Sequence, residues 1–198
     1  MNREIIIVIF VISLLVFYVD PTFDSDVTFV VAKLDNRKYI VRNIPNSKQQ
    51  AAELLANINE KNLKLLTHLK QNFPNDPRTI LFEKNYNPNA ISEGSANDQY
   101  TSYSINKGEK IIYCLRSKEN NEFMNINTLT YISYHEISHL LTESIGHDSS
   151  FWDNFKWLLS EAVKINLYTI EDYSLNNVRY CGIDITNNIL IDSEKKNK

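Results

Sequence analysis

Two histidines four positions apart give this sequence its clearest chemical signal: His135 and His139, with Glu136 directly after the first. If the segment is helical, both imidazoles lie on one face and can reach one metal ion. Imidazole is a preferred ligand of Zn²⁺, and zinc lowers the pKa of a bound water toward 7. The Glu136 carboxylate can accept the proton of that water, so the motif predicts hydrolysis with a general base.

A catalytic zinc site needs a third protein ligand and an open position. His147 is the preferred candidate, because the preceding glycine can turn the chain sharply and bring this imidazole back to the metal. Glu143 lies one turn beyond His139, which leaves its carboxylate too far from a metal held by the two helical histidines. Asp148 is a weaker rival, and we interpret it as a carboxylate that orients a histidine.

The spacing beyond the motif resembles that of the WLM and SprT-like zincins, a group of zinc metallopeptidases. The residues that carry the resemblance are His135, Glu136, His139, Gly146, His147, Asp148, Phe151 and Trp152. The resemblance implies a minimal zincin fold, with an active-site helix, a backing helix and a small sheet whose edge strand binds a polypeptide substrate. Over residues 38–190 the chain is also similar to WLM-type proteins of large DNA viruses.

For this sequence the resemblance implies zinc ligands at His135, His139 and His147 and a general base at Glu136. The loop between His139 and His147 is two residues longer than the commonest spacing in the group. That difference leaves the path of the loop open.

Two helices are expected to position these residues. The first begins at Asn127 and runs through both motif histidines to about Ser144, with Gly146 as its C-terminal stop. The second runs over 151–166, capped by one of the two serines that precede it. Its aromatic residues are expected to pack in the core rather than to contact substrate.

The remaining elements predict an α+β domain in which helices pack on a small, mostly antiparallel sheet. A long helix spans 47–73, and Ser47 with Gln50 has the spacing of a capping box. A loop is expected over 85–97. The expected strands are 27–33, 39–42, 78–83, 100–105, 110–115 and part of 182–191, and a turn at 106–108 joins two of them as a hairpin.

Several residues have two interpretations on sequence alone. The strand 110–115 is either the edge strand that binds a peptide or an ordinary internal strand. Arg116 either binds a substrate carboxylate or, preferably, pairs with a surface acid. Tyr173 and Tyr180 follow the motif in the region where an oxyanion-stabilising side chain can lie. Nothing in the sequence chooses between them.

The two cysteines, Cys114 and Cys181, lack the spacing of metal ligands. A disulfide is expected if the domain lies outside the cytoplasm. Two buried thiols are the preferred interpretation for a reducing compartment.

The N-terminus carries an apolar run from Ile5 to Val19, which Asp20 and Pro21 end. It predicts a single-pass membrane anchor over 1–20, followed by a metallopeptidase domain over 21–198. A cleaved signal peptide is the rival, although no small-x-small cleavage site follows the run. Arg3 favours a domain outside the cytoplasm, whereas the lack of any Asn-x-Ser/Thr sequon disfavours a secretory lumen. The side of a host or virion membrane therefore stays open.

The net charge of −3, without a basic cluster, argues against a nucleic-acid partner. Only four glycines are present, and no phosphate-binding loop is found. The leading hypothesis is a membrane-anchored zinc metallopeptidase. The alternative is a catalytically inactive, zinc-stabilised structural or binding protein of a viral or cellular membrane. A membrane adaptor with an accidental histidine motif is the third possibility.

Overall fold

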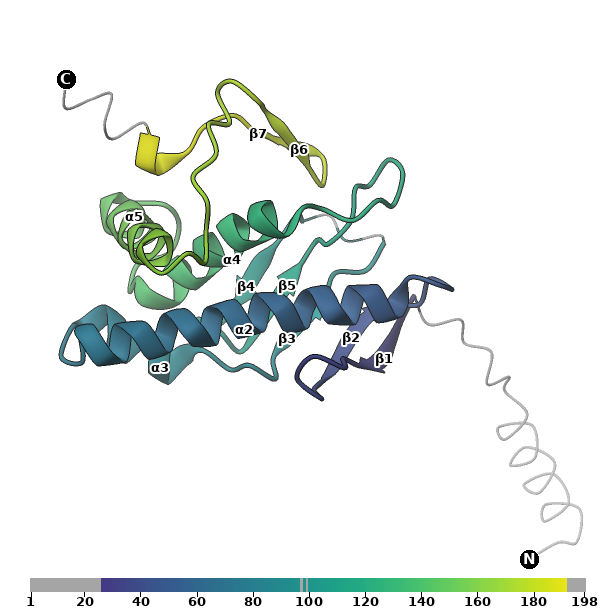
Figure 1. Cartoon of the computed structure of the whole chain (residues 1–198), viewed down its shortest axis with the longest axis horizontal. Helices are drawn as coiled ribbons and strands as arrows, with labels where there is room; N and C mark the ends of the chain where they lie inside the picture. The colour runs from purple at the N-terminus through teal and green to yellow at the C-terminus, as the bar shows by residue number, and fades with distance from the viewer. Residues whose placement is uncertain (1–25, 97, 99, 192–198) are drawn as a thin grey trace, which may run out of the picture.

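The computed structural model of the chain describes residues 26–96, 98 and 100–191. The helices are α2 (Lys48–Asn72), α3 (Pro77–Asn85), α4 (Ile126–Leu141) and α5 (Ser149–Lys164). The strands are β1 (Val27–Val31), β2 (Lys38–Arg42), β3 (Ile91–Glu93), β4 (Tyr103–Ile105), β5 (Lys110–Tyr113), β6 (Val178–Tyr180) and β7 (Ile183–Ile185). The expected α+β architecture is confirmed, with α2 crossing in front of the sheet in Figure 1.

The main sheet has the strand order β1-β2-β3-β5-β4. The pairs β1–β2 and β4–β5 are antiparallel, which confirms the hairpin expected around the turn at 106–108 and shows that the strands expected over 27–33 and 39–42 form a second hairpin. The pairs β2–β3 and β3–β5 are parallel. The sheet is therefore mixed, antiparallel at its margins and parallel in its centre. The expectation of a mostly antiparallel sheet missed that centre.

The parallel centre exists because of β3, a three-residue strand inside the segment that was predicted to be a loop. Ile91 and Glu93 point to the interior and are almost fully buried. A strand this short leaves too little sequence pattern to recognise, and its stability comes from neighbours on both sides. The loop prediction over 85–97 was wrong at this point.

The helix α2 confirms the long helix predicted from the sequence. Its buried residues recur at intervals of three and four, as expected for one face laid against the sheet and α4. The predicted capping box is wrong, because Ser47 makes no side-chain cap to the helix. Its hydroxyl instead accepts a hydrogen bond from Arg116, 2.8 Å away.

The helix α3 lies where a strand over 78–83 was predicted, so that prediction was wrong. The start signal was present in the sequence: Asp76 accepts a hydrogen bond from the backbone N–H of Arg78, and Pro77 occupies the first turn. The β-branched residues that follow suggested a strand. The N-cap and packing against α2 and α4 outweigh that preference.

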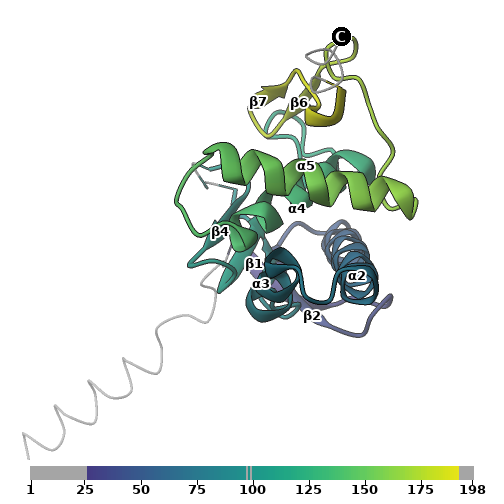
Figure 2. The ribbon, with the colours of Figure 1, turned by 90° about the vertical axis from the view of Figure 1, so that its left-hand side faces the viewer.

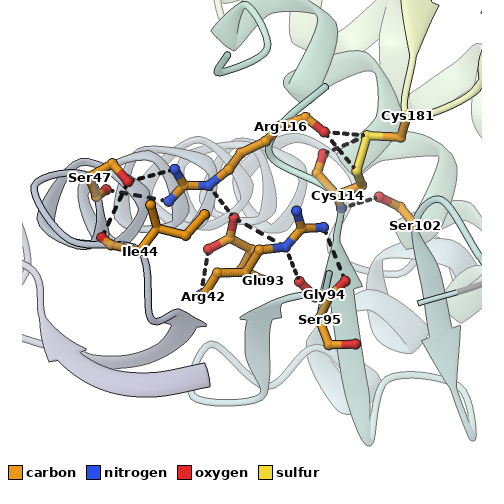
Figure 3. A network of polar contacts seen from close by, with 10 residues as sticks. All are labelled: Arg42, Ile44, Ser47, Glu93, Gly94, Ser95, Ser102, Cys114, Arg116 and Cys181. Atoms are coloured by element: carbon orange, nitrogen blue, oxygen red, sulfur yellow. Dashed lines mark hydrogen bonds and ion pairs between the residues drawn. A yellow bond between two sulfur atoms is a disulfide. The ribbon is translucent and has the colours of Figure 1, made fainter. Parts of the chain in front are cut away.

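A buried ion network ties α2 to the sheet, as Figure 3 shows. Glu93 accepts a hydrogen bond from Arg116 Nε at 2.7 Å and another from the backbone N–H of Arg42 at 2.8 Å. The Arg42 guanidinium donates to the carbonyl oxygen of Gly94. Arg116 was expected to pair with a surface acid, and that is wrong, since both Arg116 and Glu93 are buried.

The helix α4 lies at the centre of the domain, between α5 on one side and α2 and α3 on the other (Figure 2). Its N-cap is Asn125 rather than Asn127, and it ends at Leu141 rather than at Ser144. Gly146 is therefore not its stop. Most of the side chains of α4 are buried, so its orientation is set by packing on several sides.

The C-terminal segment forms a separate two-stranded sheet, β6–β7, above α4 in Figure 1. Only the second of its strands lies within the predicted stretch 182–191. A disulfide joins Cys181, in the turn between β6 and β7, to Cys114, directly after β5, with 6.3 Å between the two Cα atoms (Figure 3). The preferred interpretation of two free thiols is therefore wrong.

The predicted membrane anchor over 1–20 lies outside the described residues. Within the part of the chain that the structure describes, no helix combines the length and the apolarity that crossing a bilayer requires.

Candidate metal centre

The helix α4 presents His135 and His139 one turn apart on the same face. Their ring centroids are 5.2 Å apart, and both side chains are half-buried. The expectation that one helix would place both imidazoles side by side is confirmed. The surrounding helix residues are buried, which fixes the direction in which the two rings point.

His147 reaches the same point from the loop between α4 and α5. Gly146 has a φ of +95°, a left-handed conformation that costs glycine little and lets the chain turn back. The Nε2 atoms of His147 and His135 are 3.0 Å apart, and the His147 ring lies 4.9 Å from the His139 ring. The structure thus brings the three predicted ligands together.

This cluster fits a zinc ion. One nitrogen from each of the three imidazoles lies within 4.8 Å of the other two. Two imidazoles on one tetrahedral zinc would hold their nitrogens about 3.3 Å apart, given Zn–N bonds of about 2.0–2.1 Å. A set of three imidazoles with no carboxylate is a known donor set of catalytic zinc.

The rival ligands lie elsewhere. Glu143 follows the end of α4 and is exposed, and it does not join the three-histidine cluster. Asp148 is the N-cap of α5, where its carboxylate accepts hydrogen bonds from the backbone N–H of Phe151 and the hydroxyl of Ser150. The interpretation of Asp148 as a carboxylate that orients a histidine therefore gives way to a role in starting the helix.

The electrostatics of the cluster keep two of the imidazoles neutral. Burial, reinforced by the neighbouring His139 and His147, lowers the pKa of His135 to about 3. Burial, with the charges of His147 and Lys107, lowers the pKa of His139 to about 4. Since a metal binds the unprotonated imidazole, both ligands are available at neutral pH.

Glu136 lies beside the histidines and lines the same cleft. Burial raises the pKa of its carboxyl to about 8, an effect that a hydrogen bond from the backbone of Ser104 partly offsets. A carboxyl group with a pKa near the working pH can both take and return a proton. The carboxyl group predicted to act as the base therefore lies in the same cleft as the three histidines.

Aromatic side chains from α5 support the imidazoles. The Phe151 ring lies 4.4 Å from His139, and the Phe155 ring lies 5.4 Å from His135. Both phenylalanines are buried, as the sequence predicted. Trp152 differs: it is 41% exposed, lies 5.6 Å from His147 and lines the cleft. The helical pattern of the sequence alone could not show that Trp152 is exposed while the neighbouring phenylalanines are buried.

The histidines lie in an open cleft of about 790 Å³. One wall comes from the segment 101–107, which contains β4. Another comes from the C-terminal hairpin through Tyr180, Ile183 and Ile185. Of this wall only Tyr180 was a candidate from the sequence, because nothing in the local sequence indicates that Ile183 and Ile185 lie near a motif some forty residues earlier.

The edge strand beside the cleft is β4. The sequence made 110–115 the candidate for that role, but β5 pairs with β3 on one side and β4 on the other and is therefore internal. Ser104, in the middle of β4, lines the cleft together with Glu136. The helix α4 contacts β4, so this edge strand borders the cleft.

Lys107 is a residue of the cleft that the sequence did not single out. Its ammonium donates hydrogen bonds to the carbonyl oxygens of Thr142 and of Ser144, the latter at 2.7 Å. These carbonyls follow the last turn of α4, where a cation is favourable. Lys107 therefore ties the β4–β5 turn to the loop that carries His147.

The two tyrosines left open by the sequence have different surroundings. Tyr173 packs against Tyr131 at 5.4 Å and is not among the residues that line the cleft. Tyr180 lines the cleft, and its hydroxyl lies 2.5 Å from the Ser102 hydroxyl. Its neighbour in the chain is the disulfide-bonded Cys181. Of the pair, only Tyr180 is near the metal cluster.

A comparison of the sequence with protein families matches the WLM domain over residues 46–197. An uncharacterized protein of Acanthamoeba polyphaga mimivirus is 28% identical over 180 residues, covering 89% of this chain and 91% of its own. An uncharacterized protein of Invertebrate iridescent virus 6 is 32% identical over 84 residues, covering 41% and 47%.

Among solved structures, Wss1 of Saccharomyces cerevisiae aligns with a TM-score of 0.49 and 19% identity. The alignment covers 64% of this chain and 88% of that one.

Proposed function

Because this chain belongs to the WLM domain family of zincin-like metallopeptidases, we propose that it is a membrane-anchored zinc peptidase that hydrolyses peptide bonds. One observation carries the proposal: three imidazoles converge beside a buried glutamate in an open cleft. An inert structural zinc site is normally closed by four protein ligands. Among the described residues, this cluster offers three.

In this proposal His135, His139 and His147 hold the zinc ion. Bound there, zinc supplies Lewis-acid activation of water and polarisation of a carbonyl group. The low pKa values of His135 and His139 leave their nitrogen lone pairs free for the ion at neutral pH. The aromatic rings of α5 hold the imidazoles in place and exclude water from behind them.

Glu136 is the general base. Its carboxylate accepts the proton that water loses on attacking the peptide carbonyl carbon, and then donates that proton to the leaving amine. Burial brings its pKa to about 8 in the metal-free protein, and a nearby cation would lower that value.

A polypeptide fits the cleft as an added strand. The outer edge of β4 has no strand partner in the described sheet, and Ser104 of β4 lines the same cleft as Glu136. An extended peptide can pair with this edge through main-chain hydrogen bonds, which would hold its backbone in front of the histidines. Such pairing binds the peptide backbone and does not depend on the identity of the peptide side chains.

The membrane part of the proposal rests on the apolar run from Ile5 to Val19. Seven residues separate that run from the first residue of β1. A linker this short would keep the domain near the bilayer surface and restrict the enzyme to substrates at that surface.

The test uses the full chain purified in detergent, with zinc measured by elemental analysis and cleavage of a denatured protein followed in parallel. The expected result is about one zinc per chain and cleavage in the wild type, with zinc retained and cleavage lost in Glu136→Gln. Cleavage that survives Glu136→Gln contradicts the mechanism. Zinc without cleavage in the wild type supports the alternative of an inactive, zinc-stabilised binding protein.

A further inference from the structure

Three large apolar side chains around the metal cleft are exposed to solvent. Ile145 is 97% exposed, Ile183 is 51% exposed and Trp152 is 41% exposed. They come from three different segments, namely the α4–α5 loop, β7 and α5, yet all line the same cleft. Single exposed apolar residues are ordinary, whereas a cluster around a cleft marks a surface that binds apolar groups.

Buried apolar side chains also line the cleft. They are Ile132, Phe155 and Ile185. They come from α4, α5 and β7, so several elements add apolar surface to the cleft that holds the histidines. A side chain entering here loses contact with water on several sides at once.

Charged partners are scarce in the cleft. Among the described residues that line it, Lys107 and Glu136 are the only ones with ionisable groups besides the histidines and tyrosines. The Lys107 ammonium is bound to two backbone carbonyls, and Glu136 is the proposed base. A charged substrate side chain would be desolvated here without a partner, which is unfavourable.

The direction of β4 connects this surface to a substrate. A peptide paired with the edge of β4 turns alternate side chains to opposite faces of the sheet. One of these faces is the one on which α4 packs. Trp152, Phe155 and Ile183 line the cleft beside α4 and β4, so they are the apolar surface that a side chain entering the cleft would meet.

We infer that the cleft selects extended polypeptide segments that carry a large apolar side chain next to the scissile bond. Folded proteins bury such side chains, so the substrate class is unfolded chains or exposed apolar termini. This inference rests on the proposed peptidase function and names its substrate. It assigns Ile145, Trp152 and Ile183 as specificity-determining residues.

The test is a binding experiment as well as a cleavage experiment. Fluorescein-labelled decapeptides that differ only in one central residue, Leu, Asp or Lys, are titrated into the zinc-loaded full chain carrying Glu136→Gln. Anisotropy reports binding without turnover. We expect the Leu peptide to bind at least about tenfold more tightly than the other two, as burial of one such side chain predicts.

Substitutions at the exposed residues of the cleft test whether these residues cause the preference for the Leu peptide. Ile183→Glu and Ile145→Glu in the same background are expected to abolish the tenfold preference for Leu. Leu175→Glu is the matched control, because Leu175 is 78% exposed but does not line the cleft. Because detergent takes up the Leu peptide equally in every variant, comparison with Leu175→Glu also removes the effect of detergent on the measured binding. Thermal melting of each variant shows that it folds.

Equal binding of the three peptides, or an equal loss in Leu175→Glu, overturns the inference. The same peptides given to the wild type separate the two ideas. Cleavage without preference for Leu overturns the inference and leaves the peptidase function intact. Preference in binding without any cleavage supports the selective cleft and contradicts the peptidase.

Discussion

The helices α4 and α5 and the hairpin β6–β7 line the same cleft but are held in place differently. The three clustered histidines lie on or between helices that pack closely against each other, and α4 also packs against α2 and α3. The hairpin pairs only with itself among the described strands. Its links to the rest include one disulfide and the contact of Tyr180 with Ser102. The metal site should therefore tolerate changes that the cleft wall does not.

The largest effect is expected when one of the proposed zinc ligands on α4 is removed. His135→Ala is expected to lose zinc almost completely and to lower the melting temperature of the zinc-loaded protein by about 10 °C, because binding free energy no longer stabilises the fold. Elemental analysis and calorimetry measure both effects.

His68→Ala is the matched control for ligand removal. His68 is the remaining histidine of the chain and lies against Glu161, away from the cluster. Its zinc content should stay near one per chain. If His135→Ala keeps its zinc as well, the metal is not bound where we expect.

The next largest effect concerns the sheet that carries β4. Glu93→Gln removes the negative charge between Arg42 and Arg116, which leaves two buried guanidinium groups without their counter-charge. We expect a loss of about 3–5 kcal/mol in the free energy of unfolding, measured by urea titration. Glu60→Gln, in an exposed pair with Lys64, should change it by less than about 1 kcal/mol. Similar losses in the two variants would contradict this account of the network.

The hairpin side is tested by opening the disulfide. The double variant Cys114→Ser/Cys181→Ser removes a cross-link that closes a loop of 67 residues, which should cost about 2–4 kcal/mol of unfolding free energy. Zinc content should stay unchanged, whereas the preference for the Leu peptide should fall. Loss of zinc in this variant would show that the hairpin and the metal helices depend on each other.

The smallest effect is a pH dependence of the metal-free protein. The pKa of Glu136 is raised from 4.5 to about 8 in the folded state. The folded protein therefore binds this proton more tightly than the unfolded chain, and stability is lost as the pH rises from about 4.5 through 8. Glu136→Gln should raise the melting temperature by a few degrees at pH 8 and by much less at pH 4.5. No difference between these pH values would contradict the burial of this carboxyl group.

The histidines change the stability of the metal-free protein with pH in the opposite direction. Since the pKa values of His135 and His139 are lowered in the folded state, their contribution is present above pH 6.5 and is lost as the pH falls toward 4 and 3. Chemical denaturation of the metal-free protein from pH 7 to pH 4 should show this loss. His135→Ala should reduce its slope.

Much of the histidine cluster could be predicted from the sequence because the information is local. The four-residue spacing of His135 and His139 on a helical pattern places them one turn apart on one face, with Glu136 directly after the first. The turn at 106–108 and the long helix α2 were equally local. An error arose where two local signals disagreed. The β-branched residues after Pro77 favoured a strand, whereas the helix start at Pro77 favoured the helix that the structure shows.

The rest of the cleft could not be predicted because it depends on pairing between distant segments. Local sequence does not say that β3 pairs in parallel with β5 and leaves β4 at the edge. Nor does it say that Lys107 reaches the carbonyls after α4.

The sequence by itself determined the candidate metal ligands, the helix that carries two of them and the α+β character of the domain, since these follow from residue types at short periodic spacings. Only the tertiary structure decided which strand faces the histidines, that Cys114 and Cys181 are joined, and that Ile145, Trp152 and Ile183 surround one cleft. The physical reason is that burial, strand order and cross-links are set by contacts between residues far apart in the chain. Such contacts leave no periodic trace in any one segment.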